Sequence, residues 1–259
     1  MDMNHCEYTQ DELGKKYPKM MHHDMNQSFD QLRTSIPSMQ RMTNQQIMGM
    51  MKMMGPNYYW PVSNQGSVNN GVLIMAHGYG PGGDQDLFDS AHSVGMIYQT
   101  TLSMGMSMMT SSHVICSVNE MIHNDVEKIF VVPVSSTAHN TLVRQWNYIF
   151  GLEENYAYAE VEQINNEKIV MLDPISDDLY AKKIILEYTN EISSDPSNEV
   201  LIIIAHGPID EVDNNIELDL MNNIGDYIKQ HTSIKTVMAF TLQDDAPKEI
   251  RDRNLDNIK

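Results

Sequence analysis

Residues 71–78 read GVLIMAHG, and residues 200–207 read VLIIIAHG. Both stretches are apolar runs that end in Ala-His-Gly. A continuous apolar run of this length predicts a strand buried on both faces, as in a parallel sheet covered by helices. The histidine and glycine that follow place an imidazole and a turn at the carboxyl end of the strand. Because the arrangement occurs twice, we expect an α/β fold with an internal repeat.

Segments with strand and helix character alternate from residue 71 onward. Strands are predicted at residues 71–77, 100–109, 127–137, 168–174, 198–208 and 233–242. Helices are predicted at residues 84–99, 111–125, 141–151, 178–193, 214–231 and 247–259. Asp84 is the expected N-cap of the first helix. This alternation predicts a parallel sheet flanked by helices, with right-handed crossovers. The second copy stops at Lys259, before a third strand, so we expect two related halves of which the second is incomplete.

The composition divides the chain into three expected parts. Residues 1–66 are polar and rich in Met, Asn and Gln. They are expected to form an N-terminal extension, partly helical or disordered, with helices near 28–36 and 42–54. The following NYYWPVSNQGSVNN is expected to be a loop. Residues 67–190 are predicted to form the first α/β domain, and residues 191–259 the start of the second half.

Charge and composition exclude several classes of partner. The net charge of −18 argues against nucleic acid and against an anionic membrane surface. No apolar run is long enough to cross a membrane and no signal peptide is visible, so we expect a cytoplasmic protein, with export open if a leader was removed. The two cysteines, Cys6 and Cys116, are too few for a disulfide framework and are expected to be ordinary residues.

Three histidines are the candidate functional residues. His77 and His206 end the two repeated strands, and the strand at 127–137 leads directly to His139. The carboxyl ends of parallel strands form the ligand-binding edge of such sheets, so His77 and His139 are expected to meet at one rim. Neutral imidazoles suit Fe, Co, Ni or Zn, and they also suit proton removal near neutral pH.

The glycine-rich loop after His77 also matches the spacing G-x-G-x-x-G, over residues 78–83. A dinucleotide site additionally needs an acidic residue near the end of the next strand, and SMGMSMM at 103–109 contains none. No nucleotide cofactor is therefore expected. The glycines, Gly78 and Gly80 among them, instead keep bulky side chains away from the imidazole of His77.

These residues resemble the sirohydrochlorin cobaltochelatases of the CbiX type, which are class II chelatases related in fold to ferrochelatase. Strand-His-Gly followed by VVP-x5-H, at residues 131–139, matches the order and spacing of that family. The second Ala-His-Gly strand resembles the long, internally duplicated members. The resemblance covers about residues 70–259 and leaves the N-terminal part outside it.

The resemblance implies an ATP-independent chelatase that inserts a divalent metal into a tetrapyrrole such as sirohydrochlorin, in cobalamin or siroheme biosynthesis. The metal, Co²⁺, Fe²⁺ or Ni²⁺, would be a substrate. His77 and His139 would be the metal-binding and catalytic residues, and His206 would correspond to the first histidine of the second half. Arg144 could pair with a substrate carboxylate. Glu120 is either a helper or an exposed helical glutamate.

Two alternatives stay open at this stage. The first is a metal-binding protein without catalysis, such as a metallochaperone or sensor on the same fold. The second concerns the clusters MDMNHC at 1–6 and MHHDM at 21–25, which either bind a soft ion such as Cu(I) or belong to a methionine-rich arm that packs on the body. The sequence does not fix the oligomeric state, and a homo-oligomer is compatible with it.

Overall fold

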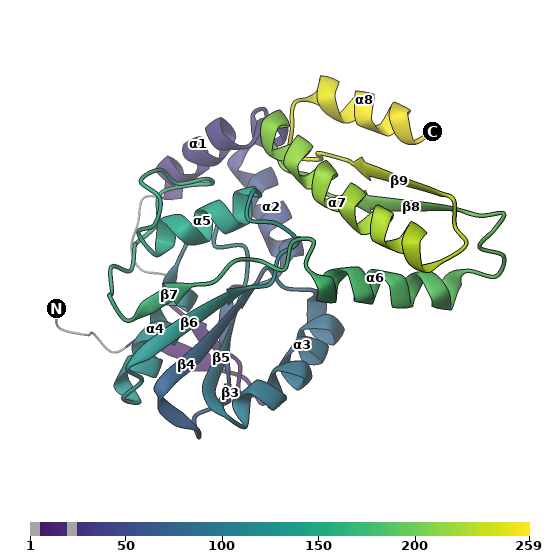
Figure 1. The fold of residues 1–259 in the computed structure, drawn as a ribbon. Helices are drawn as coiled ribbons and strands as arrows, with labels where there is room; N and C mark the ends of the chain where they lie inside the picture. The colour runs from purple at the N-terminus through teal and green to yellow at the C-terminus, as the bar shows by residue number, and fades with distance from the viewer. Residues whose placement is uncertain (1–5, 20–24) are drawn as a thin grey trace. The chain divides into compact units, whose positions relative to one another are not determined.

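The structure is a computed structural model that describes residues 6–19 and 25–259 (Figure 1). It divides into two compact units. Unit 1 comprises the chain up to Ser35, Arg41–Val134 and Arg144–Asp173, and unit 2 comprises Ile36–Gln40, Ser135–Val143 and Pro174–Lys259. This division differs from the three consecutive parts expected from the sequence. The histidines at positions 5, 22 and 23 lie outside the described residues, so copper binding by those clusters stays a prediction.

Unit 1 is built on a seven-stranded sheet whose central part is parallel. Its parallel strands are, in spatial order, β5 (Tyr98–Met104), β4 (Ser67–Ala76), β6 (Lys128–Pro133) and β7 (Ile169–Met171). Strand β4, which carries the first Ala-His-Gly motif, lies between β5 and β6 with Leu73 opposite Thr101 and Val131. The predicted α/β class with a parallel sheet is therefore confirmed.

The N-terminal part of the chain extends this sheet with antiparallel strands. These are β1 (Tyr8–Gln10), β2 (Lys16–Pro18) and β3 (Tyr58–Ser63), and β3 pairs directly with β5. The prediction of a loop over this last segment was wrong. Its Tyr-Tyr-Trp sequence has high strand propensity and is buried, whereas the prediction gave more weight to the Asn, Ser and Gly residues around it.

Helices flank the strands of unit 1 (Figure 1). They are α1 (Met25–Ser35), α2 (Asn44–Met54), α3 (Gly80–Gly95), α4 (Ser112–His123) and α5 (Thr141–Ile149), of which α5 begins in unit 2. A capping box between Thr43 and Gln46 starts α2. Asp84 is not the N-cap of α3: that helix begins one turn earlier, with Tyr79 in the cap position. The four residues before Asp84, Gly80-Pro81-Gly82-Gly83, are helical, which the prediction did not anticipate.

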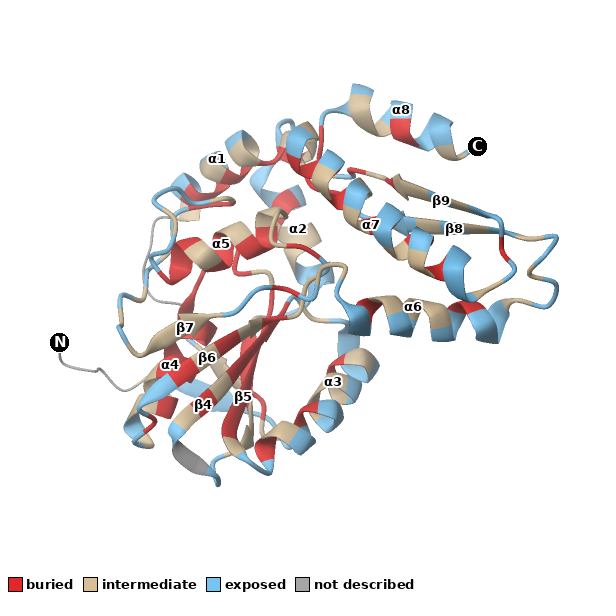
Figure 2. Cartoon of the chain, viewed as in Figure 1, coloured by how far each residue is buried: buried red, intermediate tan, exposed pale blue. Residues whose placement is uncertain are grey.

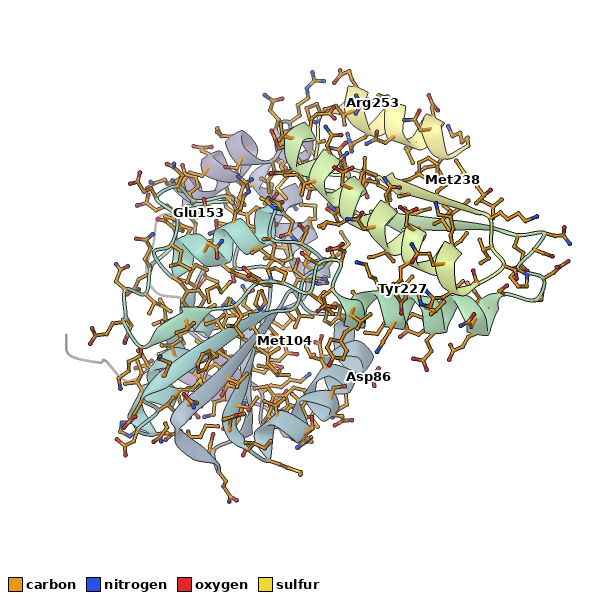
Figure 3. All side chains as sticks on the ribbon, viewed as in Figure 1. Asp86, Met104, Glu153, Tyr227, Met238 and Arg253 are labelled. Atoms are coloured by element: carbon orange, nitrogen blue, oxygen red, sulfur yellow. A yellow bond between two sulfur atoms is a disulfide. The ribbon has the colours of Figure 1, made fainter. Side chains whose placement is uncertain are left out.

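The core of unit 1 lies between β3, β4 and β5 and the helices packed on them (Figure 2). Trp60 stacks on Phe88 of α3 with 3.8 Å between ring centroids. Leu102 and Met104 of β5 are fully buried, and Figure 3 shows Met104 among the strands. The methionine-rich stretch after β5 is also core, with Met108 2% and Met109 0% exposed, but the strand predicted over residues 100–109 ends at Met104.

A disulfide joins Cys6, which precedes β1, to Cys116 in α4. The expectation that both cysteines are ordinary residues was wrong, because the fold of the N-terminal strands brings together residues 110 positions apart. Lys16 of β2 adds a second link to α4. Its Nζ lies 2.6 Å from a carboxylate oxygen of Glu120, which also accepts a hydrogen bond from the hydroxyl of Tyr59. Glu120 is thus an internal ion-pair partner rather than an exposed helical residue.

Unit 2 repeats the strand-helix order that the sequence predicted. After α6 (Leu179–Ile192), the elements are β8 (Val200–Ala205), α7 (Glu211–His231), β9 (Thr236–Thr241) and α8 (Lys248–Ile258). β8 and β9 form a separate, parallel two-stranded sheet, on which α7 packs. None of the helices within the described residues has both the length and the apolar character needed to cross a bilayer.

The two copies of the repeated strand differ in burial. Leu73 and Met75 of β4 are 0% exposed, and α4 packs on this strand. The corresponding residues of β8, Ile202 and Ile204, are 49% and 51% exposed. Met238 on β9, labelled in Figure 3, is also exposed. In unit 2, one face of the short sheet therefore lacks the cover that its counterpart in unit 1 has.

Candidate functional site

His77 follows the last residue of β4, at the carboxyl end of the central strand of unit 1. The next residue, Gly78, has φ of +94°, and Gly207 at the same place in the second motif has φ of +79°. These left-handed conformations favour glycine, which explains the His-Gly pair at both strand ends. Gly80 also has a positive φ, of +79°, at the start of α3. The loop thus turns sharply and leaves the imidazole of His77 exposed.

A cavity of about 610 Å³ opens beside His77, entirely within unit 1. Its wall combines tyrosine rings, methionine side chains and a few polar groups. The lining includes Lys15, Tyr17, Met53, Met54, Tyr58, His77, Tyr79, Asp84 and Met106. Most of the wall other than His77 and its loop comes from the N-terminal part of the chain, which the family resemblance does not cover.

Asp84 organises the polar side of this cavity. Its carboxylate accepts a hydrogen bond of 2.7 Å from the Tyr58 hydroxyl and one of 2.6 Å from the backbone N–H of Tyr79. Burial, reinforced by the hydrogen bond to Asp84, raises the pKa of Tyr58 far above its ordinary value. Burial and the charge of Asp84 also raise the pKa of Tyr79. Both phenols therefore stay protonated at neutral pH and do not act as bases.

His139 lies in unit 2, in the segment that follows β6. Its backbone N–H donates a 3.1 Å hydrogen bond to the Thr137 hydroxyl. Its Nδ1 is 3.8 Å from a carboxylate oxygen of Asp213 on α7. The imidazole is 42% exposed and the Asp213 side chain 11% exposed, so the carboxylate lies inside and the ring faces outward.

His206 lies at the end of β8, also in unit 2. Its Nδ1 is 2.9 Å from the carbonyl oxygen of Gly207, and its Nε2 is 3.8 Å from a carboxylate oxygen of Asp245. Glu217 of α7 connects the two histidine segments, since it accepts a 3.3 Å hydrogen bond from the Ser136 hydroxyl and interacts electrostatically with His206. Burial raises the pKa of Glu217, and the hydrogen bond and the charge of His206 oppose this shift.

The sequence-predicted residues thus fall into two groups. His77, Gly78 and Gly80 line the cavity of unit 1. His139 and His206 belong to unit 2, each with a carboxylate nearby. Arg144 lies in the first turn of α5, as predicted, and is half-buried. Across the part of the chain that the structure describes, no three His, Cys, Asp or Glu side chains form a group that could hold a metal ion.

Sequence reasoning missed the carboxylates of unit 2 and the lysine of unit 1. Asp213 and Glu217 are four residues apart on α7, a spacing that places both on one helix face and that could have been read from the sequence. No sequence spacing predicts the positions of Asp245 and Lys15. The folded chain brings Asp245 near His206 and Lys15 to the cavity that contains His77.

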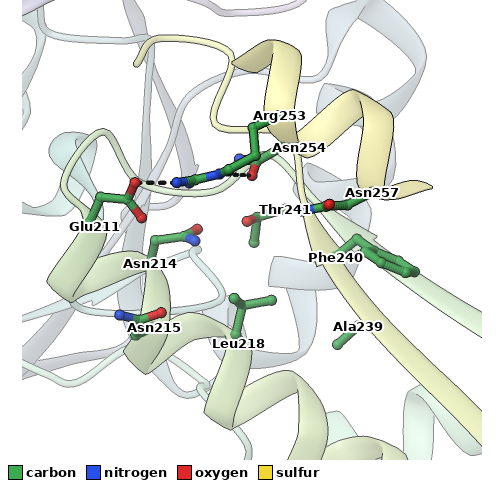
Figure 4. A pocket seen from close by; sticks show the side chains of 10 residues that line it. All are labelled: Glu211, Asn214, Asn215, Leu218, Ala239, Phe240, Thr241, Arg253, Asn254 and Asn257. Carbon is green, nitrogen blue, oxygen red and sulfur yellow. Dashed lines mark hydrogen bonds and ion pairs between the residues drawn. The ribbon is translucent and has the colours of Figure 1, made fainter. Parts of the chain in front are cut away.

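A second cavity, of about 620 Å³, lies in unit 2 between α7, β9 and α8 (Figure 4). The ion pair between Arg253 and Glu211, at 2.8 Å, spans one side of it, and Arg253 also approaches Asn254. The side-chain oxygen of Asn214 is buried and has no hydrogen-bond partner among the described residues. None of the three candidate histidines lines this cavity.

Comparison of the chain with protein-family models, with curated proteins and with solved structures gave no match.

Proposed function

We propose that this protein is a chelatase-like α/β protein that inserts a divalent metal ion, Co²⁺ or Fe²⁺, into a tetrapyrrole such as sirohydrochlorin. One observation carries the proposal: His77, at the end of the central parallel strand, lines a cavity of about 610 Å³. That volume is within the range of roughly 300–1,000 Å³ that holds small-molecule ligands and cofactors. The tyrosine and methionine side chains of the wall suit a flat, largely apolar ring.

In this proposal the metal is a substrate, held by neutral imidazole while the tetrapyrrole binds. His77 supplies one ligand and His139 a second. As the metal enters the macrocycle, two pyrrole N–H bonds break and both protons leave as H⁺. A histidine or a carboxylate must accept these protons. The proposed acceptors are His139, whose Nδ1 lies 3.8 Å from Asp213, and His206, whose Nε2 lies 3.8 Å from Asp245.

A second candidate function is metal binding without catalysis, as in a metallochaperone or sensor. The observation that favours it is the presence of Met53, Met54 and Met106 in the cavity that contains His77. Thioethers together with imidazole favour soft ions such as Cu(I), which are not the metals of a cobalt or iron chelatase. The bound metal would then be cargo, and the cavity would not receive a tetrapyrrole.

The two functions are separated by mixing purified protein with Co²⁺ and sirohydrochlorin and following the absorption spectrum. We expect the spectrum of the metallated tetrapyrrole to develop with wild type. The rate should fall about 100-fold or more in His77→Ala and in His139→Ala. His92→Ala, which removes an exposed histidine of α3, is the matched control and should retain the rate. Metal binding without a spectral change of the tetrapyrrole would support the second function, and an unchanged rate in His77→Ala would overturn the first.

A further inference from the structure

Lys15 is a buried cation in the wall of the His77 cavity. The residue is 8% exposed, and its Nζ lies 4.6 Å from the ring centroid of Trp60 and 5.0 Å from that of Tyr58. Both rings belong to β3. The ammonium therefore lies against two aromatic faces, at a position where the side chain also borders a cavity large enough for a ligand.

The segment that carries Lys15 is held in place by several hydrogen bonds. The backbone N–H of Lys15 donates a 2.8 Å hydrogen bond to the carboxylate of Asp11, and the indole N–H of Trp60 donates one of 2.9 Å to the carbonyl of Leu13. Strand β2 begins at the next residue, Lys16, which pairs with Tyr59 of β3. The backbone at Lys15 is thus held by the fold, and the residue is buried.

The neighbouring Lys16, unlike Lys15, forms an ion pair, with Glu120. Among the described residues, Lys15 has no carboxylate within ion-pair distance. Two aspartates near the cavity already accept phenol hydrogen bonds: Asp11 accepts the hydroxyl of Tyr17, and Asp84 accepts the hydroxyl of Tyr58.

Burying an ammonium group without a hydrogen-bonded anion costs free energy, and aromatic faces offset that cost only in part. Among the described residues the Lys15 ammonium, which has three N–H bonds, has no hydrogen-bond acceptor, so a ligand in the cavity that Lys15 lines can supply one. The hydroxyl protons of Tyr17 and Tyr58 are already donated to aspartates, so these phenols do not compete for an incoming anion. A carboxylate would complete the site with a charge-assisted hydrogen bond.

We propose that Lys15 is the anion-binding residue of the His77 cavity and receives a carboxylate group of the bound ligand. The inference rests on the proposed function, in that the ligand is a tetrapyrrole with peripheral carboxylates. Between residues 71 and 150 the chain has only two cations, Lys128 and Arg144, for a polycarboxylate substrate. The segment between β1 and β2 supplies a third, Lys15, which gives the N-terminal region a role in substrate specificity.

The test measures the binding of metal-free sirohydrochlorin, and of its methyl ester, by the change in tetrapyrrole absorption and protein fluorescence. We expect the dissociation constant for the acid to rise about tenfold in Lys15→Met and to recover largely in Lys15→Arg. The ester should bind wild type and Lys15→Met alike. The affinity of wild type for the acid should also fall with added salt, because the contact is ionic.

Lys19→Met is the matched control. It removes the same charge from the same segment, but Lys19 is 70% exposed and pairs with Glu7. This variant should bind the acid as wild type does. Circular dichroism and urea midpoints establish that each variant is folded. Equal binding of the acid by wild type and Lys15→Met would overturn the inference and leave the proposed function intact. Failure of wild type to bind either acid or ester would overturn the proposed function itself.

Discussion

His113 is a histidine whose side chain is almost completely removed from solvent. It is 1% exposed in α4, its Nε2 lies 3.2 Å from the Ser107 hydroxyl, and its Nδ1 has no hydrogen-bond partner among the described residues. Burial lowers the pKa of His113 from 6.5 to about 3. The ring is therefore neutral in the folded protein at neutral pH.

This lowered pKa predicts a loss of stability in mild acid. Below about pH 6.5 the unfolded chain binds a proton at His113 that the folded chain does not bind, so the free energy of unfolding falls as the pH falls toward about 3. Between about pH 7 and pH 5.5 the loss from this residue should be about 1 kcal/mol. Urea unfolding of wild type and His113→Gln at both pH values measures it, and the variant should lose about that much less. Equal losses in the two proteins would contradict this assignment.

Individual site residues were predicted from the sequence only where the chain itself carries the signal. The apolar run before His77 and the glycine after it define a strand end with an exposed imidazole, and the structure has this arrangement. Lys15 could not be predicted, since its burial depends on Trp60 and Tyr58, more than forty residues away in the chain. Asp84 was placed near the right helix end, but the side chain that hydrogen-bonds to it, Tyr58, comes from β3.

At the scale of elements, the two repeated strands provide a matched comparison of burial. Leu73 of β4 and Ile202 of β8 occupy the same position relative to Ala-His-Gly, and they are 0% and 49% exposed. Leu73→Ala should lower the free energy of unfolding by about 2–5 kcal/mol, as expected for a large-to-small change in a core. Ile202→Ala should cost less than about 1 kcal/mol, because a half-exposed side chain loses less apolar burial.

Urea unfolding, followed by circular dichroism, measures both changes. Each variant serves as the control for the other, since the sequence motif and the strand position are the same. A cost for Ile202→Ala as large as that for Leu73→Ala would show that the exposed face of β8 is covered in solution. That result would contradict the difference in burial between Leu73 and Ile202.

The disulfide between Cys6 and Cys116 also contributes to stability. It joins the segment before β1 to α4 across 110 residues, and closing so long a loop restricts the unfolded chain. The double variant Cys6→Ser, Cys116→Ser should lower the free energy of unfolding by about 2–4 kcal/mol. The free thiols counted under denaturing conditions should be close to zero in protein isolated without reductant. Two free thiols per chain in such a sample would contradict the bond.

Such a bond persists in oxidising compartments and is rare in the cytosol of most organisms. Finding it intact in protein from its natural source would therefore favour export over the cytoplasmic location expected from the sequence.

Helices and strands from residue 71 onward were predicted well because their apolar periodicity is strong and their turns are marked by glycine, proline or asparagine. β3 was missed because a short aromatic segment between polar residues has no clear period, and pairing with β5 decides its structure. The short strands β1 and β2 depend in the same way on pairing with other strands. Local signals thus define the repeated part of the fold, whereas the N-terminal part depends on contacts distant in sequence.

At the scale of the whole molecule, the candidate residues are shared between two units. His77 and Lys15 belong to unit 1, and His139 and His206 belong to unit 2. Each unit contains one copy of the strand that ends in Ala-His-Gly. The proposed function assigns a metal ligand to each unit, His77 in unit 1 and His139 in unit 2.

X-ray absorption spectroscopy of the Co²⁺-loaded protein tests this assignment directly, because it counts the imidazole ligands of the bound ion. We predict two imidazoles in wild type and one in each of His77→Ala and His139→Ala. His92→Ala should keep the wild-type spectrum. A spectrum that is unchanged in His77→Ala would show that the ion binds elsewhere, and it would contradict the account of His77 as the metal-binding residue.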